Sequence, residues 1–313
     1  MARRQKGRNV TGILLLDKPG GMTSNKVLQE VKQLFFARKA GHTGSLDPLA
    51  TGMLPICFGD ATKVSGFLLD ADKRYTVTCK LGIKTTTADS EGDILEQRSV
   101  PELDHDGLEA VLDQYRGDIE QIPPMHSALK HNGERLYNLA RQGIEVERQA
   151  RSVTIYELSL LSLNKDELEL EVHCTKGTYV RTLVEDIGES IGCGAHVIQL
   201  RRLAVGAYQD PAGMITLDVL REMEQADRET RGGYAELDKL MHSVESALGA
   251  WPDVQLTEDA TYYLRQGQPV LVKQSPTEGL VRLFNPQFQF IGVGEIQEDG
   301  MVAPRRLFGA GKG

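Results

Sequence analysis

The chain has 313 residues, of which 40% are hydrophobic and 26% charged, and a formal net charge of −8. This length and apolar content favour two domains; no apolar run reaches the 18 residues of a membrane span, and the basic N-terminus lacks the apolar segment of a signal peptide. The four cysteines form no C-x-x-C pair, which argues against a zinc site or a disulfide framework and favours free thiols in the cytoplasm.

The charge is unevenly distributed along the chain. Residues 1–82 hold 13 Lys or Arg against 6 Asp or Glu, although the whole protein is acidic. Phosphate binding needs a local basic surface rather than a basic protein, so a nucleic-acid partner is compatible with this composition. A solubilising tail at residues 1–10 accounts for only part of the asymmetry.

The first elements are a strand and a helix. Residues 12–19 form an apolar run that stops at Lys18-Pro19 and two glycines, which predicts a short buried strand followed by a turn. Ser24 is a candidate N-cap for a helix whose apolar residues, from Val27 to Phe35, recur at helical spacing. Its basic residues lie off that stripe and form a cationic outer face.

The stretch from Gly41 to Gly52 reads G-H-T-G-S-L-D-P-L-A-T-G and predicts a loop, because it holds three glycines and a proline. Its titratable side chains are His42 and Asp47, and Pro48 keeps Asp47 out of the helical region. A carboxylate on a stiff, partly shielded loop suits nucleophilic or acid/base chemistry. The alternative is a simple turn in which Asp47 caps a short helix and His42 is exposed.

A half-buried strand is predicted at residues 73–81, after a short helix at 61–69. Apolar and polar side chains alternate along it, and Tyr75 lies on the apolar face. A tyrosine in this setting is usually part of the core, but its hydroxyl needs a polar partner. A polar, threonine-rich loop containing Asp89 follows, and then helices are predicted at residues 106–115 and from 136 onwards.

Two further strands are predicted at residues 153–156 and 167–174. If the second continues through C-x-K-G-T-Y-x-R, Tyr179 and Arg181 are two residues apart and point to the same side. An aromatic ring and a guanidinium on one face would suit a base and a carboxylate held close together. A helix at residues 182–191 ends at a glycine pair, and Leu200 in the next segment would by itself be assigned to the core.

The last third of the chain changes character. Residues 221–248 are acidic and helical in pattern, whereas short strands and turns follow from about residue 252. The expected strands are 268–272, 280–284 and 290–296, with a hairpin turn at 297–300 leading to a last strand.

Seven strings, in this order, resemble motifs of the TruB family of tRNA pseudouridine synthases. They are D-K-P-x-G-x-T-S at 17–24, G-H-T-G-S-L-D-P-L-A-T-G at 41–52, K-R-Y at 73–75, the threonine-rich loop at 82–92, Q-I-P-P-M-H-S-A-L-K at 121–130, C-x-K-G-T-Y-x-R at 174–181, and the segment 195–203. The resemblance implies that Asp47 is the catalytic aspartate and that Arg181 pairs with it. It also implies that Tyr75 stacks on the target base, that Tyr179 contacts the flipped nucleotide, and that Leu200 lines the base pocket.

The resemblance carries further expectations for the supporting residues and the substrate. His42 would push into the T-loop of tRNA while the uridine at position 55 is flipped out, and Lys18, Pro19 and Asp89 would support the catalytic loop. No cofactor, metal or guide RNA is implied, and the T-arm of tRNA is the expected partner of a monomer. His126 stands where family members carry Tyr or Phe.

The implied fold is α+β. A pseudouridine-synthase-like mixed β-sheet flanked by helices would span residues 11–250, and a small all-β PUA-like barrel that binds RNA would span 251–313. Two other functions use the same fold. A non-catalytic RNA-binding protein need not keep Asp47, Tyr75 and Arg181 together, and a guide-RNA-dependent synthase would carry extra segments around its core.

Overall fold

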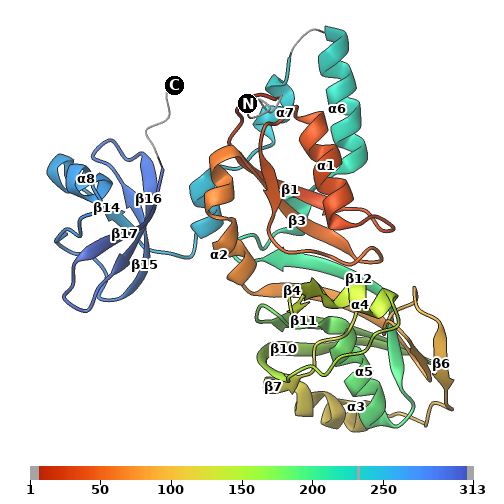
Figure 1. Ribbon diagram of the computed structural model, residues 1–313. Helices are drawn as coiled ribbons and strands as arrows, with labels where there is room; N and C mark the ends of the chain where they lie inside the picture. Colours follow the sequence, from red (N-terminus) through yellow and green to blue (C-terminus); the bar gives the residue numbers. More distant parts are fainter. Residues whose placement is uncertain (1–6, 231–232, 309–313) are drawn as a thin grey trace.

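The computed structural model describes residues 7–230 and 233–308 (Figure 1). Its main element is a nine-stranded mixed sheet in the order β13-β1-β3-β12-β4-β11-β10-β7, with β2 paired to β3. The strands are β1 (Gly12–Lys18), β2 (Ala40–His42), β3 (Thr51–Phe58), β4 (Lys73–Leu81), β7 (Gly117–Gln121), β10 (Arg151–Asn164), β11 (Glu167–Cys174), β12 (Ala195–Val205) and β13 (Ile215–Thr216).

Strand β12 joins the two halves of this sheet. It pairs in parallel with β3 and antiparallel with β4, while β3 and β4 do not pair with each other. Arg202 on β12 lies opposite both Gly52 on β3 and Tyr75 on β4. The strand therefore brings a segment adjoining the Asp47 loop next to the strand that carries Tyr75.

Helices cover the two halves separately. In the first half, apolar residues of β1 and β3 pack against α1 and α6; in the second, those of β4 and β11 pack against α3 and α5 (Figure 1). Strand β1 buries both faces, because Leu14 and Leu16 enter one cluster and Ile13 and Leu15 another. The helices are α1 (Ser24–Leu34), α2 (Ser65–Asp70), α3 (His105–Leu112), α4 (Leu136–Arg141), α5 (Val180–Ile191), α6 (Leu217–Thr230) and α7 (Ala235–Lys239).

The remaining elements before residue 250 are short. Two small hairpins pair β5 (Ile83–Thr85) with β6 (Ile94–Gln97) and β8 (Lys130–His131) with β9 (Glu134–Arg135). The helix expected at 61–69 is divided into a 3₁₀ turn, η1 (Gly59–Lys63), and α2. Three more 3₁₀ turns are η2 (Asp113–Tyr115), η3 (Pro211–Gly213) and η4 (Val244–Leu248).

The start of the chain differs from a free tail. Arg8 forms an ion pair with Asp238 on α7, and its backbone N–H donates to the Phe36 carbonyl. Residues 1–6 of the expected tail lie outside the described residues. Helix α1 is capped by Thr23, whose side chain accepts from the Lys26 N–H, and not by Ser24 as its position suggested. No helix in the described part of the chain is both long and apolar enough to cross a membrane.

The C-terminal part is a four-stranded sheet with one helix. Its order is β14 (Asp253–Gln255), β15 (Gly279–Phe284), β16 (Phe290–Ile296) and β17 (Val302–Leu307), and the sequence interpretation missed helix α8 (Glu258–Arg265). The hairpin turn at 297–300 is present between β16 and β17. Among the described residues the strands do not close into a barrel, and the expected strand 268–272 is reduced to one bridge between Val270 and Val302.

Candidate active site

Asp47 and Arg181 form an ion pair at the centre of the site. The Arg181 Nε lies 2.9 Å from Asp47 Oδ2, and the Asp47 side chain keeps 40% of its surface exposed while that of Arg181 keeps 5%. A reactant could therefore reach the carboxylate but not the guanidinium. The pairing expected from the sequence is present, although the backbone around Arg181 is not the expected strand.

Arg181 lies in the first turn of α5, whose N-cap is Tyr179, and β11 ends at Cys174. The prediction that Tyr179 and Arg181 share the face of one strand is therefore wrong. Gly177 adopts a φ of +82°, which turns the chain between the strand and the helix. Tyr179 is fixed through its backbone, since its N–H donates to Gln121 Oε1 at 3.0 Å, while its ring is half-buried.

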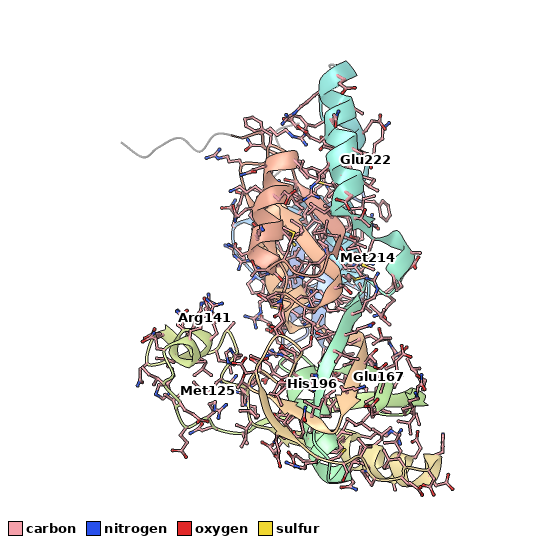
Figure 2. The ribbon with its side chains drawn as sticks, turned by 90° about the vertical axis from the view of Figure 1, so that its right-hand side faces the viewer. Met125, Arg141, Glu167, His196, Met214 and Glu222 are labelled. Atoms are coloured by element: carbon pink, nitrogen blue, oxygen red, sulfur yellow. The ribbon has the colours of Figure 1, made fainter. Side chains whose placement is uncertain are left out.

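Arg181 also connects two other segments to the Asp47 loop. Nη1 donates to the Thr87 carbonyl at 2.8 Å and lies 3.5 Å from the buried Asp89 carboxylate, and Nη2 donates to the His126 carbonyl at 2.9 Å. The segment that contains Met125 and, in α4, Arg141 extends away from the sheet (Figure 2). One guanidinium on α5 thus ties the Asp47 loop to two other chain segments.

The surroundings of Asp47 shift its pKa in opposite directions. Burial raises the pKa of the Asp47 carboxyl, Arg181 opposes that rise, and Asp89 adds to it. The carboxyl is therefore more basic than an ordinary aspartate, which suits a group that must accept a proton or attack carbon.

Hydrogen bonds from Lys18 and Ser24 brace the Asp47 loop. The buried Lys18 ammonium donates to the carbonyls of Pro19 at 2.8 Å, Pro48 at 3.2 Å and Ala50 at 2.6 Å. The Ser24 hydroxyl exchanges two hydrogen bonds with the backbone of Leu46, at 2.8 and 2.9 Å. Burial lowers the pKa of Lys18 to about 8, and Asp47 opposes this shift. Bracing is thus the role that this geometry gives Lys18.

Replacing Lys18 by Met should loosen the loop that holds Asp47. Three buried or partly buried carbonyls lose their donor, which costs on the order of 1–3 kcal/mol for each fully buried acceptor left unsatisfied. We expect a lower melting temperature and a slower reaction at saturating substrate. Lys239→Met, which removes only an exposed pair with Glu236, is the matched control. Equal effects of the two substitutions on rate would contradict the bracing role.

Tyr75 and Leu200 lie beside this loop on neighbouring strands. Leu200 is buried in the same apolar cluster as Leu46 and Ala50, and the half-buried ring of Tyr75 packs against that cluster. Burial raises the pKa of the Tyr75 hydroxyl, and the guanidinium of Arg202 opposes the rise. The structure therefore brings Asp47, Tyr75, Arg181 and Leu200 together.

His42 lies at the end of β2, just before the loop. Its ring is half-buried, and no described residue forms a hydrogen bond with its buried Nδ1. Burial, followed by the charge of Arg202, lowers the pKa of His42, which favours the neutral ring. Sequence reasoning missed Arg202, Ser24 and Gln121 as parts of this environment, because their partners are distant in sequence.

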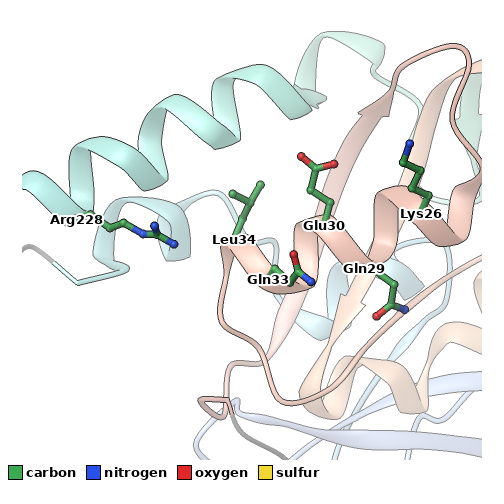
Figure 3. Close-up of a pocket in the computed structure, with 6 residues that line it drawn as sticks. All are labelled: Lys26, Gln29, Glu30, Gln33, Leu34 and Arg228. Atoms are coloured by element: carbon green, nitrogen blue, oxygen red, sulfur yellow. The ribbon is translucent and has the colours of Figure 1, made fainter.

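A separate open cleft lies between α1 and α6 and contains none of the residues of the Asp47 site (Figure 3). It is lined by polar side chains together with one leucine: Lys26, Gln29, Glu30, Gln33, Leu34 and Arg228. Its position and its lining therefore do not connect it with the Asp47 site.

Comparison with protein-family models places the protein in the class of pseudouridylate synthases. The family models that match are the N-terminal domain of the TruB family pseudouridylate synthases over residues 32–180, the C-terminal domain of tRNA pseudouridylate synthase B over 181–249, and the C-terminal model of pseudouridine synthase II TruB over 252–308.

Curated relatives extend this similarity to nearly the whole chain. The tRNA pseudouridine synthase B of Nitrosococcus oceani is 55% identical over 97% of both chains, and that of Tolumonas auensis is 55% identical over 97% of this chain and 94% of its own length. The chain belongs to the TruB family of tRNA pseudouridine synthases, which are isomerases.

A solved Cbf5–Nop10–Gar1 complex contains a chain with a similar fold. The TM-score is 0.74 at 25% identity, and the alignment covers 96% of this chain and 85% of that one. A chain of an H/ACA RNP bound to a substrate RNA aligns with a TM-score of 0.73 at 21% identity, covering 100% of this chain and 92% of that one. The second likeness shows the fold alone.

Proposed function

We propose that the protein converts uridine 55 in the T-loop of tRNA to pseudouridine, with Asp47 as the catalytic carboxylate. The observation that carries the proposal is the ion pair of 2.9 Å between Asp47 and Arg181, with Asp47 partly exposed beside Tyr75 and Leu200. The curated relatives with 55% identity are named tRNA pseudouridine synthase B, which supports tRNA as the substrate. The protein would act as a cytoplasmic monomer without a guide RNA.

The reaction breaks the bond between the ribose and ring nitrogen 1 of uracil and forms a new bond from the same sugar carbon to ring carbon 5. The proton on carbon 5 leaves, and nitrogen 1 gains one, so no redox step or phosphate transfer occurs. Asp47 acts either as nucleophile or as proton acceptor, and Arg181 stabilises its charged form. The uridine must first leave the RNA stack, and His42 would occupy the space that it vacates.

The other residues of the site either bind the flipped nucleotide or hold the catalytic segments in place. Tyr75 stacks on the flipped base, Tyr179 contacts the nucleotide, and Leu200 lines the pocket. Lys18, Pro19 and Asp89 hold the segments that carry Asp47 and Arg181. Sequence-specific RNA readers mostly select loops because loop bases can be splayed out, which agrees with a T-loop target.

The direct test measures tritium released from uracil carbon 5 of a T-loop stem-loop RNA, with purified protein and no guide RNA. We expect release that depends on the uridine at the target position, and none from an RNA with cytidine there. Binding without release would favour a non-catalytic RNA-binding protein. Release only after a guide RNA is added would favour the guide-dependent class.

Tyr75→Phe keeps the ring and removes the hydroxyl, while Tyr75→Leu removes both. We expect both changes to slow turnover in protein that still melts cooperatively, with Leu no better than Phe. If the ring served only the core, melting temperature would fall while activity per folded molecule stayed unchanged. Single-turnover rates and thermal melts on the same samples separate these outcomes.

We further propose that residues 11–250 form the catalytic domain and that 251–313 form a PUA-like domain that binds RNA. Truncation after Leu248 should weaken tRNA binding and make it less salt-dependent, because fewer phosphates are neutralised. The melting temperature should also fall, because the truncation removes Trp251, whose ring packs edge-on against that of Phe67 with 4.9 Å between the ring centroids. The rate at saturating RNA should stay within about an order of magnitude. A folded truncation that is inactive at every RNA concentration would contradict this division.

A further inference from the structure

Arg202 is a buried cation without a carboxylate partner. Only 1% of its surface is exposed, and no described acidic side chain lies within ion-pair distance of it. Its neighbour Arg201 is the opposite case, because it is half-buried and binds both carboxylate oxygens of Asp17, at 2.9 and 2.8 Å. Burying an unpaired charge is costly, so the position of Arg202 requires another explanation.

The hydrogen bonds of Arg202 connect two segments of the site. Nε donates to the Met53 carbonyl on β3 at 2.7 Å, and Nη2 donates to the Gly44 carbonyl at 3.3 Å. Gly44 lies two residues after His42 and three before Asp47. The guanidinium therefore attaches the start of the Asp47 loop to the sheet, whereas Lys18 holds the part of the loop that follows Asp47.

The sheet register places Arg202 beside Tyr75. The two residues are directly opposed on the antiparallel pair β12 and β4, so their side chains share one face. On the other side of β12, a Cβ at Gly52 would lie 2.3 Å from the Arg202 carbonyl oxygen, and Gly52 has a φ of +96°. Glycine at that position lets β3 approach Arg202 closely.

The charge of Arg202 also affects the pKa values of His42 and Tyr75, the two residues near its guanidinium. It lowers the pKa of His42 in addition to burial, and it opposes the effect of burial on the Tyr75 hydroxyl. The ring expected to enter the RNA and the ring expected to stack on the base thus depend on one buried side chain.

We propose that Arg202 is a positioning residue for the reaction: its guanidinium holds the Gly44 carbonyl, and with it the His42 segment, in register with Tyr75. The inference rests on the proposed function. Arg202 does not contact RNA, because its surface is covered, and it acts through His42 and Tyr75. Its loss should slow the chemical step without a comparable loss of binding.

The test compares Arg202→Lys and Arg202→Gln with the matched changes Arg201→Lys and Arg201→Gln. The rate at saturating T-loop RNA, the Kd, the melting temperature and hydrogen exchange at residues 43–46 are measured for each protein. We expect Arg202→Lys to slow the single-turnover rate by about 10- to 100-fold with Kd within about threefold, as for a small misplacement of reacting groups. Arg202→Gln should be slower still.

Exchange at residues 43–46 should be faster in both Arg202 variants and unchanged in both Arg201 variants, whose rates should stay near that of the wild type. Equal losses at the two arginines, a loss confined to Kd, an unchanged rate, or an Arg202→Lys protein that does not fold would each overturn the proposal. If wild-type protein releases no tritium, the proposed function fails, whereas the exchange measurement still tests the attachment of the segment.

Discussion

Asp47→Asn should abolish turnover while affinity for a T-loop RNA stays within a few-fold of the wild-type value. The substitution preserves shape but removes the charge and basicity on which the proposed reaction depends, whereas we expect affinity to come mostly from phosphates and stacking. We expect the single-turnover rate to fall on the order of 10³-fold or more. The measurement is pseudouridine formed under saturating protein, with Kd from a separate titration.

Asp166→Asn is the matched control, because Asp166 pairs with Lys80 at 2.7 Å on the surface of the sheet and lies outside the site. This control should react at the wild-type rate. An Asp47→Asn protein that forms pseudouridine at a rate near the wild-type value would show that another group carries the chemistry.

Arg181→Met should have the second-largest effect, on both stability and rate. It leaves the buried Asp89 without its nearby cation and Asp47 without its pair, and removing one partner of a buried pair costs about 3–5 kcal/mol. The partial exposure of Asp47 puts the expected loss at the low end of that range. Denaturant unfolding would measure the stability, and Arg221→Met, which removes surface pairs with Glu30 and Asp218, is the control.

Arg181→Lys separates charge from geometry and gives a pH signature. Lysine keeps a positive charge but cannot reproduce the four contacts of the guanidinium. Because Arg181 opposes the rise in the pKa of Asp47, weakening the pair should raise that pKa further. In the proposed mechanism the active form is the carboxylate, so the acidic limb of the rate profile should move to higher pH. A limb that stays in place would show that Asp47 ionisation does not control the rate.

The residues of the candidate site were easier to predict from sequence than the backbone conformation that holds them. Glycines and a proline define the Asp47 loop locally, so that the loop could be recognised from sequence. The helical conformation of Arg181, in the first turn of α5, could not be predicted. Thr178, Tyr179 and Val180 favour strands in isolation, and only packing of α5 against the sheet overrides that preference. Arg202 could not be predicted either, since its partners, Gly44 and Met53, are more than a hundred residues away.

The two wrong secondary-structure predictions in the C-terminal part have local causes. Helix α8 is eight residues long, and its signals are the cap Thr257 and two acids in the first turn rather than an apolar stripe. The segment 268–272 looked like a strand because of its valines and leucine. Pro269 lacks the N–H that a ladder needs, and the segment contributes only the bridge at Val270.

The late insertion of β12 between β3 and β4 has a consequence for protein synthesis. A nascent chain that has emerged only as far as Cys193 already contains Asp47, Tyr75 and Arg181, but it lacks the strand that pairs with both halves of the sheet. Contacts between residues distant in sequence form late, because the chain closing them must first be made and then ordered. Residues 195–205 must therefore leave the ribosome before the two halves of the sheet can be joined, and a shorter translation product lacks the framework that holds the Asp47 loop next to Tyr75.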